Sequence, residues 1–159
     1  MIFSFVVKRL GFIKSIPLTA LIFDSGLKLW LFISKSEKLD WFDDLEEEIL
    51  NWNGVTISLH KFGGTQFNYG KHEIGHLHSN GILDILFDKK TKAELIATGK
   101  AKAHHVFNNS GWISFYIEKK DDLPDAISLL RMRYDKIVSK TMITSKALLQ
   151  EFPIFDATL

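Results

Sequence analysis

The chain of 159 residues contains no cysteine. This absence excludes a disulfide framework, a thiol nucleophile and a thiolate metal site, so a metal ion would have to be held by histidine nitrogen and carboxylate oxygen. An excess of one charge is also missing, since 20 lysines and arginines stand against 19 acidic residues. Proteins that bind nucleic acid usually carry a basic excess, so we expect no nucleic-acid partner.

The sequence also lacks a long uninterrupted apolar run. Residues 1–33 are rich in Phe, Ile and Leu, but charges divide them, and the longest uncharged stretch after Lys8 and Arg9 is Ser15–Phe23. A bilayer span needs about 20 apolar residues, and no small-residue cleavage pattern indicates a secretory signal. We therefore expect a cytoplasmic protein whose N-terminal segment packs on the domain or on a partner subunit. Interfacial contact with a membrane is the weaker alternative.

The apolar fraction of 46% suits one domain with a substantial core. The polar stretch Ser34–Asp40 is the clearest change of composition in the chain. We place a boundary there and divide the chain into an apolar N-terminal appendage (1–38), a folded domain (39–140) and a C-terminal tail (141–159).

Patterns of apolar residues predict the elements of the folded domain. Alternation and turn residues predict strands at 55–60, 65–69, 72–78, 82–87, 103–107 and 112–118. Helical spacing predicts helices at 40–51 and 89–98, and one from 121 onward with the apolar stripe Leu123, Ile127, Leu130, Tyr134 and Ile137. Short hairpin connections favour an α+β domain with a mainly antiparallel sheet and helices on one face. Polar strand residues should then collect on the other face.

Histidines are the main candidates for chemistry on that open face. In an extended strand, His76 and His78 project to the same side, where two imidazoles can share one cation, and we predict them as metal ligands. Only one of His104 and His105 can join them, because neighbouring residues point to opposite faces, and we choose His105. The same alternation adds ligand-binding candidates from other strands: His60, Trp112, Ser114 and Tyr116.

Asp84 is the candidate carboxylate for this site. Strict alternation places Glu73 on the opposite face from His76, which leaves Asp84 as the ligand, base or partner that orients a histidine. The structural alternative is that Asp84 caps a turn or sheet edge and that the histidines only hydrogen-bond backbone and hydroxyl groups.

These residues match known metal and phosphate motifs only in part. Gly70 followed by His76 and His78 resembles the start of the cupin metal motif, but no glutamate follows at the required distance, so a cupin barrel is not expected. The glycines form neither a dinucleotide fingerprint nor a phosphate loop, and we assign them to turns and close backbone contacts.

Several ordered motifs resemble a family of bacterial and fungal proteins named luciferase domain. They are His60–Gly64, Glu73–His78, Gly99–His105, Ser110–Trp112 and Leu129–Tyr134, and the resemblance covers roughly residues 39–134. The family name does not imply light emission, and the resemblance carries over no reaction or cofactor. Lys61 stands where the family often has arginine, and Leu86–Asp88 lacks the family's flanking prolines, so loop geometry and anion binding are not carried over. The last section is also similar, more weakly, to the two-layer YjbR-like fold.

The sequence therefore predicts a domain that binds a small molecule or a metal ion through a histidine-rich sheet face, with a divalent metal as the candidate cofactor. Whether the domain is an enzyme stays open. The alternative is a non-catalytic module for protein interaction or for association with a second copy of the chain.

Overall fold

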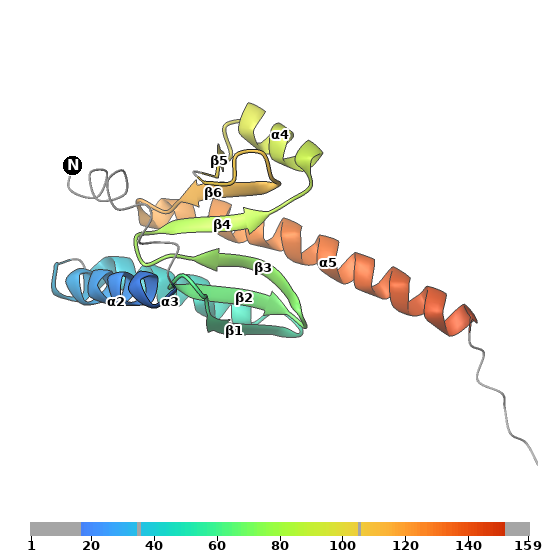
Figure 1. Cartoon of the computed structure of the whole chain (residues 1–159), viewed down its shortest axis with the longest axis horizontal. Coiled ribbons are helices and arrows are strands. Elements are labelled where there is room, and N and C mark those ends of the chain that lie inside the picture. Colours follow the sequence, from blue (N-terminus) through green and yellow to red (C-terminus); the bar gives the residue numbers. More distant parts are fainter. Residues whose placement is uncertain (1–16, 35, 105, 152–159) are drawn as a thin grey trace, which may run out of the picture.

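A computed structural model of the protein describes residues 17–34, 36–104 and 106–151. It contains a six-stranded sheet in the order β1-β2-β3-β4-β6-β5, and every neighbouring pair is antiparallel (Figure 1). The strands are β1 (Val55–Leu59), β2 (Thr65–Tyr69), β3 (His72–Leu77), β4 (Ile82–Leu86), β5 (Lys102–Ala103) and β6 (Trp112–Tyr116). The helices are α2 (Pro17–Ser34), α3 (Ser36–Leu50), α4 (Lys89–Ala97) and α5 (Leu123–Glu151), with a 3₁₀ turn η2 (Lys120–Asp122). The predicted α+β class and antiparallel sheet are confirmed.

The hydrophobic core lies between the sheet and the helices α3 and α5. Helix α5 runs across the sheet and continues beyond it (Figure 1). Its predicted stripe is buried at Leu123, Leu130, Tyr134 and Ile137, and Ile127 is partly buried. Strands contribute apolar side chains to the same core: Phe67, Ile74, Leu77, Leu83, Ile85 and Ile113. One face of the sheet is therefore covered by α3 and α5 and packed in the core.

Gly75 allows α5 to approach β3 closely. A Cβ atom at this position would lie 3.0 Å from Leu130 Cδ2 and 2.9 Å from the Asp84 carbonyl oxygen. The glycine inside β3 therefore serves a close contact, as a glycine within a strand often does.

Several elements differ from the prediction in their boundaries or in their burial. Helix α3 begins at Ser36 rather than at Asp40, and α5 continues to Glu151, so residues 141–151 of the predicted tail are helical. In β1, Val55 is the one buried residue, and Ile57 and Leu59 are 42% and 67% exposed instead of facing the core. The reason is that β1 lies at the edge of the sheet.

The strand predicted at 103–107 ends at Ala103. The ring nitrogen Nδ1 of His104 accepts hydrogen bonds from the backbone N–H groups of Val106 and Phe107, at 3.0 and 3.1 Å. These bonds turn the chain away from the sheet, so alternation no longer applies after Ala103.

Helix α2 packs against α3 and presents apolar side chains to solvent. Ile22, Leu29 and Trp30 are between 62% and 66% exposed. Within the described ranges, no helix combines the length and the hydropathy needed to cross a membrane.

Candidate functional site

A row of polar residues crosses the open face of the sheet. Strand pairing aligns Gln66 with His76, His76 with Asp84, and Asp84 with Ser114, so the four side chains belong to neighbouring strands β2, β3, β4 and β6. Directly paired residues project to the same side of an antiparallel sheet. Asp84 is completely buried near the middle of this row.

The Asp84 carboxylate is surrounded by a hydroxyl and imidazoles. Ser114 donates its hydroxyl proton to Oδ1 at 2.5 Å. The other oxygen, Oδ2, lies 3.3 Å from His78 Nε2, 3.3 Å from His104 Nε2 and 3.6 Å from His76 Nε2. The carboxylate therefore lies where three imidazole rings converge, and the structure brings His76, His78, Asp84 and Ser114 together on this face.

Asp84 is ionised in this environment. Burial by itself would raise the pKa of a carboxyl group, because it disfavours the charged form. The neighbouring groups of His104, His78 and Ser114 outweigh that effect and hold the pKa of Asp84 far below its usual value. The centre of the row is thus a buried negative charge.

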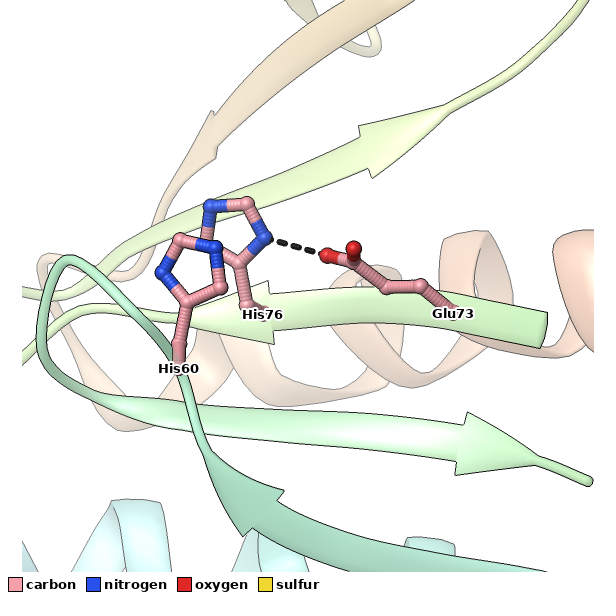
Figure 2. A group of neighbouring side chains, drawn as sticks. All are labelled: His60, Glu73 and His76. Carbon is pink, nitrogen blue, oxygen red and sulfur yellow. Dashed lines mark hydrogen bonds and ion pairs between the residues drawn. The ribbon is translucent and has the colours of Figure 1, made fainter. Parts of the chain in front are cut away.

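Glu73 also belongs to this face, and the prediction that it lies opposite His76 was wrong. The reason is a β-bulge, since Phe67 pairs with Gly75 but the next residue, Asn68, pairs with Glu73. The extra residue, Ile74, is buried in the core, and strict alternation is interrupted between Glu73 and His76. As Figure 2 shows, Glu73 Oε1 faces His76 Nδ1, at 2.5 Å.

Hydrogen bonds distinguish the roles of two histidine rings. Because His76 Nδ1 donates to the Glu73 carboxylate, the neutral ring keeps a lone pair on Nε2, which faces Asp84. In His104 the arrangement is reversed: Nδ1 accepts two backbone N–H groups, so the proton of the neutral ring is on Nε2. His76 can thus ligate a metal through Nε2. In His104 the same atom carries the proton and points it toward the Asp84 carboxylate.

His60 stacks on His76 at the edge of the cluster. The ring centroids are 3.7 Å apart with an interplanar angle of 10°, and the rings lie face to face in Figure 2. Burial and, secondarily, the neighbouring His76 lower the pKa of His60 to about 4, so its ring is neutral near pH 7. His60 Nδ1 is buried without a hydrogen-bond partner, and His60, Glu73 and His76 form a second group with metal-binding geometry.

The remaining predicted residues divide into three cases. Trp112 lies beside the cluster, with its ring 5.4 Å from that of His76 and 6.2 Å from that of His104. Tyr116 continues the row on β6, but its ring contacts Lys102 Nζ at 4.7 Å. His105 lies outside the described residues, and the neighbouring His104 is the one that reaches Asp84.

Sequence reasoning missed Glu73 and His104 as members of the cluster. The one local signal for Glu73 was Gly75, because a glycine inside a strand often accompanies a bulge. His104 gave no such signal, since its position depends on hydrogen bonds that its own ring makes to the following backbone.

Fold and cluster together define an α+β domain with a carboxylate-centred group of histidines on one sheet face. A family model described as Luciferase domain matches residues 71–133, which confirms the resemblance over that part of the chain. The matched range contains Glu73, His76, His78, Asp84 and Ser114, but not His60. Comparisons with curated proteins and with solved structures gave no significant match. The YjbR-like similarity stays a prediction.

Proposed function

We propose that the protein binds one divalent transition-metal ion through His76 Nε2, His78 Nε2 and Asp84 Oδ2. The observation that carries this proposal is the spacing around Oδ2, which is buried and makes no hydrogen bond of good geometry. Its distances of 3.3 and 3.6 Å to His78 and His76 exceed the 2.7–2.9 Å expected of a charge-assisted hydrogen bond. They are close to the separation of about 3.4 Å between two ligands of a tetrahedral ion with bonds of about 2.1 Å.

The ligand types suit Zn²⁺ or another first-row ion. Imidazole nitrogen and carboxylate oxygen both bind Zn²⁺, and two histidines with one carboxylate also serve Fe²⁺. His76, His78 and Asp84 each offer one ligand atom, and these atoms lie within 4.8 Å of one another. Three protein ligands leave at least one coordination position for water or a small molecule, next to the indole of Trp112.

Groups behind the ligands support the proposal. Metal-bound histidines usually donate their second ring N–H to a carboxylate, which fixes the ring and raises its basicity. Glu73 occupies that position behind His76. His104 Nε2 and the Ser114 hydroxyl lie against the Asp84 carboxylate and hold it in place.

A cobalt titration tests the proposal directly. We expect the wild-type protein to bind one equivalent of Co²⁺, followed by visible absorption, and to release it to Zn²⁺. His76→Ala and His78→Ala should each weaken binding by 100-fold or more, because each removes one of three protein ligands. The matched control is His72→Ala, which removes the exposed histidine at the start of β3. Failure of the wild-type protein to bind stoichiometrically, or equal binding by all three variants, would refute the site.

A further inference from the structure

The Asp24 carboxylate of α2 reaches the turns that carry two of the histidines. Although α2 belongs to the apolar N-terminal segment, Asp24 is buried, with 7% of its surface exposed. Its Oδ2 accepts the backbone N–H of Gly64 at 2.8 Å, and its Oδ1 accepts that of Ser79 at 3.3 Å. One carboxylate thus joins two segments that follow different strands.

Both segments are tight turns that begin at a histidine of the cluster. The first is closed by a hydrogen bond from Gly63 N–H to His60 C=O at 2.9 Å. The second is closed by a hydrogen bond from Gly81 N–H to His78 C=O at 2.8 Å. Because Ser79 follows His78 directly, a shift of the Ser79 N–H group moves the His78 backbone as well.

The contact with α2 also explains Gly63 in the first turn. A Cβ atom at Gly63 would lie 2.4 Å from Asp24 Cβ and 2.7 Å from Asp24 Cγ, and Gly63 has φ of +89°. A side chain at this position would therefore displace α2. This close approach is independent of the two hydrogen bonds and indicates that Asp24 packs in a defined position against the first turn.

Lys38 at the start of α3 holds the second turn from another side. Its Nζ donates to the Asn80 carbonyl oxygen at 3.1 Å. The turn from His78 to Gly81 is therefore bound by a carboxylate from α2 and by an ammonium group from α3, which is more support than a surface turn requires.

We propose that Asp24 is a positioning residue for the metal site, an inference that rests on the proposed function. By holding the Ser79 N–H group, Asp24 fixes His78 so that its Nε2 stays near Asp84 Oδ2, now 3.3 Å away. Metal sites require their ligands to be held within about 0.5 Å of the productive geometry. Helix α2 is then part of the framework of the site.

The test compares Asp24→Asn and Asp24→Ala with the wild-type full-length chain by Co²⁺ titration. Asparagine keeps one acceptor oxygen, which satisfies one N–H group, but places an amide NH₂ beside the other. We expect about tenfold weaker binding for Asp24→Asn, a larger loss for Asp24→Ala and altered visible bands in both, as is typical of supporting groups around metal ligands. Asp135→Asn removes an exposed carboxylate of α5 that pairs with Arg131, and it should match the wild type.

The outcomes separate the two proposals. If the wild-type protein binds no Co²⁺, the metal site itself is refuted and the inference falls with it. If it binds Co²⁺ and both Asp24 variants match it in affinity and spectrum, Asp24 has no positioning role although the site stands. Circular dichroism checks folding without metal, and Asp24→Asn, which retains one hydrogen bond, decides the comparison if Asp24→Ala does not fold. A lower melting temperature with an unchanged cobalt spectrum would also overturn the inference.

Discussion

Replacing Asp84 with asparagine is expected to abolish the stabilisation of the protein by zinc. For the wild-type protein, Zn²⁺ at 1,000 times its Kd should raise the free energy of unfolding by about 4 kcal/mol. In a chain of this size, that increase corresponds to a rise in melting temperature of about 10 °C. The variant should show a shift close to zero, because Asp84 supplies the only anionic ligand of the proposed set.

Asparagine is the informative replacement because it preserves the shape of the side chain. Its amide oxygen can still accept the Ser114 hydroxyl proton, while the NH₂ group that replaces Oδ2 cannot bind a cation. The measurement is the difference between melting temperatures with and without Zn²⁺, so a change in the stability of the metal-free protein cancels. Asp44→Asn, at an exposed carboxylate paired with Lys120, is the matched control. An Asp84→Asn protein with the full zinc shift would show that the ion binds elsewhere.

Gly64→Ala should cause a large loss of stability. Gly64 has φ of +87°, and a Cβ atom there would lie 2.1 Å from the Leu77 carbonyl oxygen and 3.0 Å from His78 Cα. Both obstacles are backbone atoms, so no side chain can rotate out of the way. We expect the free energy of unfolding to fall by more than about 3 kcal/mol, since strain, overlap and disturbance of the hydrogen bond to Asp24 act together.

Gly70→Ala provides the control for backbone strain alone. Gly70 also has a positive φ, +56°, but a Cβ atom there would have no neighbour within 4 Å. Its substitution should cost about 1 kcal/mol, the usual penalty for a left-handed alanine. Urea unfolding of the two variants measures the difference. Equal losses would mean that the backbone around Gly64 relaxes and that the close approach to Leu77 is not restrictive.

Much of the fold follows from local pattern. Alternating residues and glycine-containing turns predicted the strands from β1 to β4 and β6, because both signals depend on neighbours within a few residues. The same alternation brought His76 and His78 to one face and pointed to Asp84, since no irregularity falls between those two histidines. The apolar stripe of α5 could also be predicted, because helical spacing depends only on residues three or four positions apart.

The parts of the site that escaped prediction depend on distant contacts. The bulge at Ile74 is created by the pairing of β3 with β2, and it reverses the face assigned to Glu73. His104 reaches Asp84 because β5 ends at Ala103, directly before it. The prediction extended the strand to residue 107 and therefore chose His105. Asp24 reads in the sequence as a charge that interrupts an apolar segment, and its link to Gly64 and Ser79 becomes visible only when α2 is in place.

The location of Asp84 in β4 has a consequence for how the cluster opens. Strand β4 is hydrogen-bonded on both sides, to β3 and to β6, whereas His60 and His78 stand where strands give way to turns. Backbone segments paired on both sides open mainly through global unfolding, while turns open locally at much lower free energy. The Asp84 carboxylate is thus held by the sheet itself, whereas the backbone at His60 and His78 depends on the contacts that Asp24 and Lys38 make with the two turns. Loss of those contacts would release the imidazoles of His60 and His78 while Asp84 stayed in place.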